Sequence, residues 1–188
     1  SKNFDEYALE VKNMMARAGY PDMELWMTEG NTAAHVQYST EQQHGVNLVR
    51  QFAYCQAYDL LDKFIFYQYQ TDEVRPNDIE SYFGIMRGPY VNNANGPKQS
   101  YMALTNFIAM TENAVHNDLI QYDNVYIHQY KRSTDGKNIL MMYADRDCKI
   151  TSLDLGATSG TLYDINGNAE KLKSADGKYV FSLADQPI

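Results

Sequence analysis

The chain has 188 residues, of which 44% are hydrophobic and 13% aromatic, and its formal net charge is −8. This apolar content is enough for a sizeable core, whereas the acidic balance and the lack of a basic patch exclude nucleic acid as an expected partner. No apolar run approaches the roughly 18 residues of a membrane span, so we expect no membrane-spanning helix. Cys55 and Cys148 are too few for a disulfide framework, and we expect two free, partly buried thiols.

Apolar residues recur at helical spacing over residues 3–18, which predicts a helix that Gly19 can cap at its C-terminal end. A short apolar run then covers residues 24–29 and breaks into a Gly-Asn loop. Because Pro21 and Gly30 bound this run, its length is typical of a buried strand rather than of a helix.

A capping box at Ser39–Gln42 predicts the start of a second helix, which runs to about Leu61. A second apolar strand is predicted over 64–69, and a loop rich in Asp, Asn, Gly and Pro follows over 71–96. A proline at the start suits a third helix over 97–113. This alternation is typical of parallel strands with crossover helices, and both strands are apolar on two faces, which favours burial on both sides.

The pattern changes after about residue 118 to short β-prone runs with Gly-containing turns between them. Asp135-Gly136, Asn166-Gly167 and Asp176-Gly177 indicate hairpins, because a type I′ turn needs a positive φ at both central positions. The predicted runs are 124–130, 138–144, 149–155, 160–165, 169–173 and 178–183. We therefore expect an α/β domain over 1–118 and an all-β domain, a small antiparallel β-sandwich or meander, over 119–188.

A carboxylate stands at the end of the first predicted strand, in Trp26-Met27-Thr28-Glu29-Gly30. A charge at the mouth of a buried strand costs free energy unless solvent, partners or a function hold it there. A purely structural interpretation, in which Glu29 only caps a loop, stays open on this motif alone. The segment resembles the seventh barrel strand of the clan of retaining glycoside hydrolases, whose nucleophile is a Glu at the end of that strand, often in Thr-Glu-x-Gly.

The resemblance extends over nearly the whole chain. Phe66-Tyr67-Gln68-Tyr69 looks like the eighth barrel strand, with Phe66 or Tyr67 where the clan usually has a Trp under the sugar. Other segments resemble the passage into the last barrel helix and the β-domain tail of these enzymes, namely 83–86, 97–104, 162–168, 176–177 and 182–188. The resemblance is closest to the β-xylosidase, α-L-iduronidase and endoglucanase-like families.

The resemblance implies the last βα units of a (β/α)8 barrel followed by the β-domain, within a longer secreted or periplasmic enzyme. That enzyme would cleave O-glycosidic bonds in oligo- or polysaccharides with retention, and Glu29 would be its nucleophile. The acid/base Glu lies on the fourth strand in the clan and is missing here, so the chain alone is expected to be inactive. Its expected partners are the carbohydrate and either the N-terminal remainder of the barrel or a second copy.

The residues expected to line the sugar subsites are His35, Phe66, Tyr67, Gln68 and Tyr69, although a plain loop histidine explains His35 equally well. Strand alternation places Met27 with Glu29 toward the barrel axis and Trp26 toward the helices, in the core. No cofactor is expected, and the histidines show no metal-ligand spacing. The alternative function is a non-catalytic carbohydrate-binding or interaction module that uses the barrel strands as a scaffold.

Overall fold

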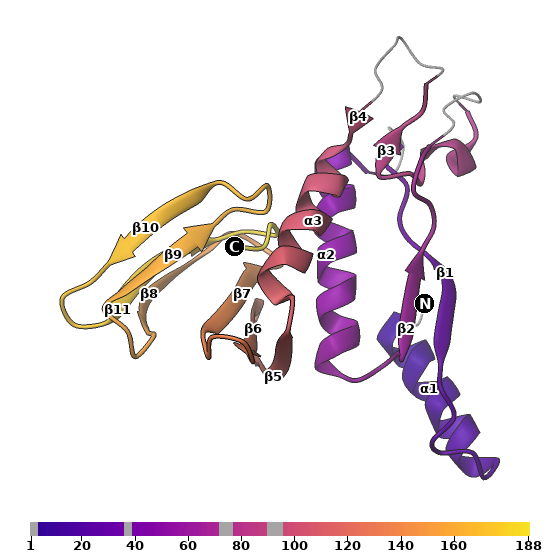
Figure 1. The fold of residues 1–188 in the computed structure, drawn as a ribbon, viewed down its shortest axis with the longest axis horizontal. Helices are drawn as coiled ribbons and strands as arrows, with labels where there is room; N and C mark the ends of the chain where they lie inside the picture. The colour runs from indigo at the N-terminus through magenta and orange to yellow at the C-terminus, as the bar shows by residue number, and fades with distance from the viewer. Residues whose placement is uncertain (1–3, 36–38, 72–76, 90–95) are drawn as a thin grey trace. The chain divides into compact units, whose positions relative to one another are not determined.

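The computed structural model describes residues 4–35, 39–71, 77–89 and 96–188 (Figure 1). The chain divides into two compact units, Ser1–Ser100 and Tyr101–Ile188. The first unit holds the parallel strands with their helices, and the second holds antiparallel sheets. The fold is therefore mixed α/β with small antiparallel sheets.

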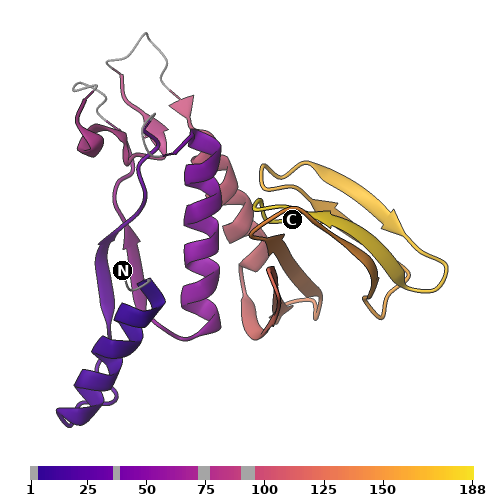
Figure 2. The ribbon, with the colours of Figure 1, turned by 180° about the vertical axis from the view of Figure 1, so that it is seen from behind.

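The first unit has the predicted order of helix, strand, helix and strand. Its two longer strands pair in parallel, with Trp26 opposite Lys63 and Met27 opposite Phe64. The α2 helix connects them and lies beside the pair in both views (Figures 1 and 2). The elements are α1 (Phe4–Arg17), β1 (Trp26–Gly30), α2 (Glu41–Ala57), β2 (Lys63–Phe66), the 3-10 helix η1 (Ile79–Tyr82), β3 (Met86–Arg87) and β4 (Gly96–Pro97).

The predicted ends of α2 need correction. Its N-cap is Thr40 rather than Ser39, and the Thr40 hydroxyl oxygen accepts a hydrogen bond from the Gln43 backbone N–H at 3.1 Å. Ser39 instead donates its hydroxyl to the Ala33 carbonyl at 2.5 Å. The helix ends at Ala57, before the predicted Leu61, because the chain turns at Asp59 with a φ of 48°.

The strands of the first unit are not buried on both faces, so this prediction was wrong for the chain as described. On one face, Phe64 packs on Phe52 of α2, with ring centroids 4.7 Å apart, and Met27 lies beside Phe64. On the other face, Trp26 is 47% exposed and Ile65 is 50% exposed. Met27 therefore shares the face of Phe64 toward α2, the reverse of the predicted orientation. The pairing of β1 with β2 has a register shift between Met27 and Gly30.

The segment predicted as a loop over 71–96 contains part of the first unit's scaffold. The predicted strand over 64–69 ends at Phe66, and the chain beyond it is held by backbone bonds to β3. The Met86 N–H donates to the Tyr69 carbonyl and the Thr71 N–H donates to the Met86 carbonyl, each at 2.9 Å. Gly84 permits this approach, since a Cβ there would lie 2.0 Å from the Thr71 nitrogen.

The second unit contains a three-stranded sheet in the order β5-β6-β7 and two two-stranded sheets, β8-β11 and β9-β10, all antiparallel. The glycines of the three predicted turns have positive φ, as expected for tight hairpins, at Gly136, Gly167 and Gly177. Its elements, with the helix that leads into it, are α3 (Gln99–Thr111), β5 (Ala114–Tyr122), β6 (Val125–Arg132), β7 (Asn138–Ala144), β8 (Cys148–Asp154), β9 (Ser159–Tyr163), β10 (Ala169–Lys173) and β11 (Lys178–Leu183).

Strand β5 has no counterpart among the strands predicted from the sequence. The polar run His116-Asn117-Asp118 interrupts its apolar alternation, and the structure has a register shift at the same place. The expected domain boundary near residue 118 falls inside this strand. The division into domains at that residue stays a prediction.

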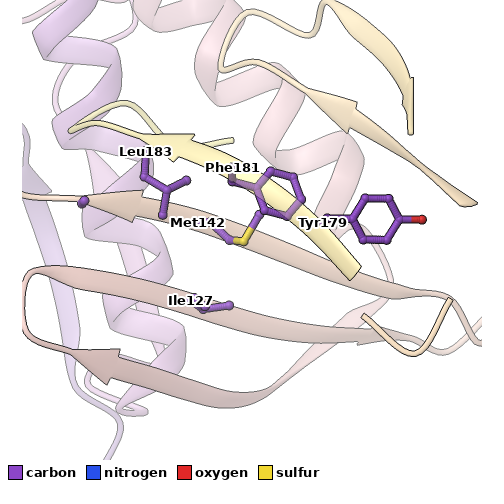
Figure 3. Packing of buried hydrophobic residues seen from close by; sticks show 6 residues of the cluster. Ile127, Met142, Tyr179, Phe181 and Leu183 are labelled. Atoms are coloured by element: carbon purple, nitrogen blue, oxygen red, sulfur yellow. The ribbon is translucent and has the colours of Figure 1, made fainter. Parts of the chain in front are cut away.

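The core of the second unit lies between β6, β7 and β11 (Figure 3). Ile127 and Met142 come from the first two strands, and Tyr179, Phe181 and Leu183 come from alternate positions of β11. Val180, between two of these core residues, is 58% exposed. The alternation shows that β11 has one buried and one solvent-facing side, which is the ordinary pattern for an antiparallel strand.

The two cysteines are free, as predicted: Cys55 is buried in α2, and Cys148 is half-buried. Burial raises the pKa of the Cys55 thiol to about 12, because a thiolate would lose its hydration there.

Candidate functional site

Glu29 lies exposed at the C-terminal end of β1, one residue before the buried Gly30. Because β1 and β2 run in parallel, their C-terminal ends meet at one edge, with Gly30 opposite Phe66. The Tyr67 N–H donates to the Gly30 carbonyl at 3.2 Å and extends this pairing past the end of β2. The structure thus brings the predicted nucleophile and the predicted subsite segment to the same edge, where side chains of α/β proteins commonly meet ligands.

The residues that follow β2 differ in how far they are open to solvent. Phe66, Tyr67 and Gln68 are half-buried, whereas Tyr69 is 61% exposed. The Tyr67 ring meets the edge of Phe83, with ring centroids 5.8 Å apart, and the peptide from Tyr67 to Gln68 is cis. The Gln68 side chain donates to the Glu80 carbonyl at 3.4 Å. Of this segment, Tyr69 offers the largest free aromatic surface.

His35 is 3% exposed and lies in the packing of the loop after β1. Its ring meets the Tyr82 ring edge-on, with centroids 4.7 Å apart, and the Ala34 N–H donates to the Tyr82 carbonyl at 3.2 Å. This environment matches a packed loop histidine more closely than a residue that faces a sugar.

A polar cluster that the sequence analysis did not single out lies directly behind the end of β1. The Asn31 side-chain amide donates to the Phe83 carbonyl at 2.9 Å and accepts from the Thr32 N–H at 2.8 Å. The same amide oxygen lies 2.9 Å from Nε2 of His44, which comes from α2 and is completely buried. The Gly-Asn break after Glu29 was the one sequence signal for this cluster, and nothing in the periodicity of α2 distinguishes His44.

The electrostatics of this cluster keep His44 neutral. Burial, with a smaller contribution from the positive charge of Lys98, lowers the pKa of His44 from 6.5 to about 4. Lys98 itself is only 2% exposed. Because a buried polar group is costly unless it is bonded, a neutral histidine and a buried lysine at this position indicate a specific polar arrangement rather than a solvated loop.

Other kinds of site find little support in the part of the chain that the structure describes. Among those residues, no three His, Cys, Asp or Glu side chains gather in a way that could hold a metal ion. None of the helices over the described ranges is long and apolar enough to cross a membrane.

The structure is similar to a solved structure of a family 39 glycoside hydrolase from the gut symbiont Bacteroides cellulosilyticus WH2. The TM-score is 0.77 and the sequence identity is 18%, over 97% of this chain and 36% of that chain. No protein-family model and no curated protein matches the sequence. The likeness shows that this chain shares its fold with about a third of the length of a glycoside hydrolase.

Proposed function

We propose that this chain is part of a retaining glycoside hydrolase that cleaves O-glycosidic bonds of oligo- or polysaccharides, with Glu29 as its nucleophile. The observation that carries the proposal is the position of Glu29, which is exposed at the end of a parallel strand beside an aromatic segment. The family 39 glycoside hydrolase supports it, since the fold matches over 97% of this chain.

The proposed chemistry needs two carboxyl groups about 5–5.5 Å apart. The ionised Glu29 attacks the anomeric carbon and forms a glycosyl ester, while the second carboxyl group protonates the departing glycosidic oxygen. The same second group then takes a proton from water, which attacks the anomeric carbon and releases Glu29. We assign this second group to a part of the protein outside this chain, because the chain spans only 36% of its structural neighbour.

The same proposal assigns β1 and β2 to the seventh and eighth strands of a (β/α)8 barrel and the sheets over 119–188 to a β-sandwich. The face that carries Trp26 and Ile65 is half exposed in this chain and would be covered by the rest of the barrel or by a second copy. A large exposed apolar surface and open strand edges favour association, so burial on this face is expected in the complete protein.

The proposed sugar subsites lie along the segment after β2. Tyr69 has an open ring that suits stacking on a pyranose face, while Phe66, Tyr67 and Gln68 form the wall behind it. His35 contributes to the same region through the packing of the loop after β1 rather than by an open face.

The test uses the longer protein that we propose to contain this chain. The Glu29→Gln variant keeps the shape of the side chain but not its charge, so we expect kcat on aryl glycosides to fall about a thousand-fold or more. Azide is expected to restore part of the turnover of Glu29→Ala, because it supplies an external nucleophile. The chain alone is expected to be inactive on the same substrates.

Glu24→Gln is the matched control. Glu24 is exposed two residues before the start of β1, where it accepts a hydrogen bond from the Trp26 indole at 2.7 Å. We expect this variant to keep near-normal turnover. If Glu29→Gln also keeps it, Glu29 is not the nucleophile, and binding of oligosaccharides without turnover would then favour the non-catalytic module.

A further inference from the structure

We propose that Asn31 and His44 form a positioning pair that fixes the end of β1 and thereby aims the carboxylate of Glu29. This inference rests on the proposed function, because it gives the pair a role in the same site. Neither residue is assigned to contact the sugar, and both would act through the backbone that carries Glu29.

The partners of Asn31 determine how its amide is oriented. The Phe83 carbonyl can only accept and the Thr32 N–H can only donate, so the NH₂ group must face Phe83 and the oxygen must face Thr32. The oxygen therefore also faces His44, and Nε2 of His44 must carry the proton in their 2.9 Å hydrogen bond. The geometry thus selects one tautomer of a neutral imidazole, with a lone pair on Nδ1.

These bonds hold the backbone immediately after Glu29 from both sides. On one side, the Gly30 carbonyl accepts from the Tyr67 N–H at 3.2 Å. On the other side, Asn31 is anchored to α2 through His44 and to the loop at Phe83. Gly30 is closely packed, since a Cβ there would lie 2.7 Å from the sulfur of Met27. The backbone is therefore held at Gly30 and Asn31, the two residues that follow Glu29.

The same pair connects the two halves of the candidate site. Phe83, whose carbonyl accepts from Asn31, places its ring against Tyr67 in the proposed subsite. One amide group therefore connects β1, α2 and the segment that packs on the end of β2. A change at His44 is expected to alter the placement of Glu29 relative to the bound sugar.

The pair is built into the core rather than formed by chance at the surface. His44 is fully buried among apolar positions of α2, where a histidine costs free energy unless it makes a useful bond. Its Nδ1 is buried and has no hydrogen-bond partner among the residues that the structure describes. Within the described ranges the one hydrogen bond of the ring is to Asn31, so the position of the imidazole is tied to that amide.

The kinetic test replaces His44 in the longer protein. His44→Phe removes the donor and keeps a ring, and we expect kcat to fall about 10- to 100-fold with KM changed much less, since small misplacements of reacting groups cost about that much. His44→Gln keeps an N–H donor and is expected to recover most of the loss. His116→Phe, at a histidine of the second unit, is the control and is expected to leave kcat unchanged.

The structural test uses nitrogen NMR on this chain. We expect His44 to be the Nε2–H tautomer at neutral pH and the Asn31 side-chain protons to exchange slowly, with this protection lost in His44→Phe. A proton on Nδ1 would overturn the pairing. If His44→Phe does not fold, Asn31→Ser takes its place in the kinetic test, because it removes the amide without adding bulk, and the His44 tautomer of the unsubstituted chain remains the structural test.

The two proposals fail in different ways. A folded His44→Phe variant with normal kcat, in an enzyme that Glu29→Gln inactivates, overturns the positioning role alone. Normal turnover of Glu29→Gln overturns the assigned nucleophile and the positioning role together.

Discussion

The buried neutral His44 makes the stability of the first unit depend on pH. Its pKa is about 4 in the folded chain and 6.5 as its ordinary value. Between these values the unfolded chain binds a proton that the folded chain does not, so the free energy of unfolding decreases as pH falls from 6.5 to 4. At about 1.4 kcal/mol for each pKa unit, the loss between pH 7 and pH 4 is about 3 kcal/mol.

The assay uses the only tryptophan of the chain, Trp26, which lies in β1 of the first unit. Its fluorescence follows urea unfolding of that unit at a series of pH values between 7 and 4. In His44→Gln the decrease in the free energy of unfolding between pH 7 and pH 4 is expected to be smaller by about 3 kcal/mol, because glutamine does not titrate. The difference between the two proteins isolates His44 from every other group.

Two groups of residues could imitate this effect and are separated by the design. The pKa values of Asp135, Asp164 and Asp176 are lowered, the first and third by hydrogen bonds and the second by hydrogen bonds that outweigh its burial. Their stabilising contributions are lost below about pH 4, outside the range measured. Burial also lowers the pKa of His116, which lies in the second unit, so His116→Gln measures its share. Equal slopes in the wild type and His44→Gln, or a His44 pKa above 6 by NMR titration, would refute the reasoning.

Two further predictions concern packing. Gly84→Ala should destabilise the chain by about 1–3 kcal/mol or more by urea unfolding, because its Cβ would meet the backbone of Thr71 at 2.0 Å. Gly160→Ala, whose Cβ meets nothing within 4 Å, should change little, and equal effects of the two would contradict the close approach. Phe181→Ala should cost about 3–5 kcal/mol, because the side chain is 4% exposed in the core of the second unit. Val180→Ala is its control at 58% exposure and should cost less than about 1 kcal/mol, so a similar cost at both positions would place the core elsewhere.

The sequence predicts those elements of this chain that are determined by residues close together in the sequence. The parallel order of β1 and β2 follows from the helix between them, and the positive φ of Gly136, Gly167 and Gly177 follows from their turn dipeptides. The remaining elements depend on hydrogen bonds between residues that are separated in the sequence. The pairing of β3 with the segment after β2 involves residues far apart in sequence, so no local pattern indicated it.

The candidate site divides in the same way. Glu29 and Tyr69 were found because a charge or an aromatic residue at the end of an apolar run is conspicuous in the sequence. Asn31 and His44 were missed because their link is a contact between a loop and the buried face of a helix. His44 lies outside the apolar face predicted for α2 through Val46 and Val49, so the helical periodicity did not indicate that its side chain is buried.

The side chains of β1 show why strict alternation along a strand predicts side-chain directions poorly near the end of the strand. Counting by two from Glu29 places Met27 on the same side, yet Met27 packs toward α2 and Trp26 is open. A register shift lies between Met27 and Gly30. An irregularity of this kind can turn one residue out of the alternating pattern, so Glu29 does not need to follow the half-buried Met27 two positions before it. We propose that the residues that follow Glu29 set its direction, because Asn31 is hydrogen-bonded there to His44 of α2.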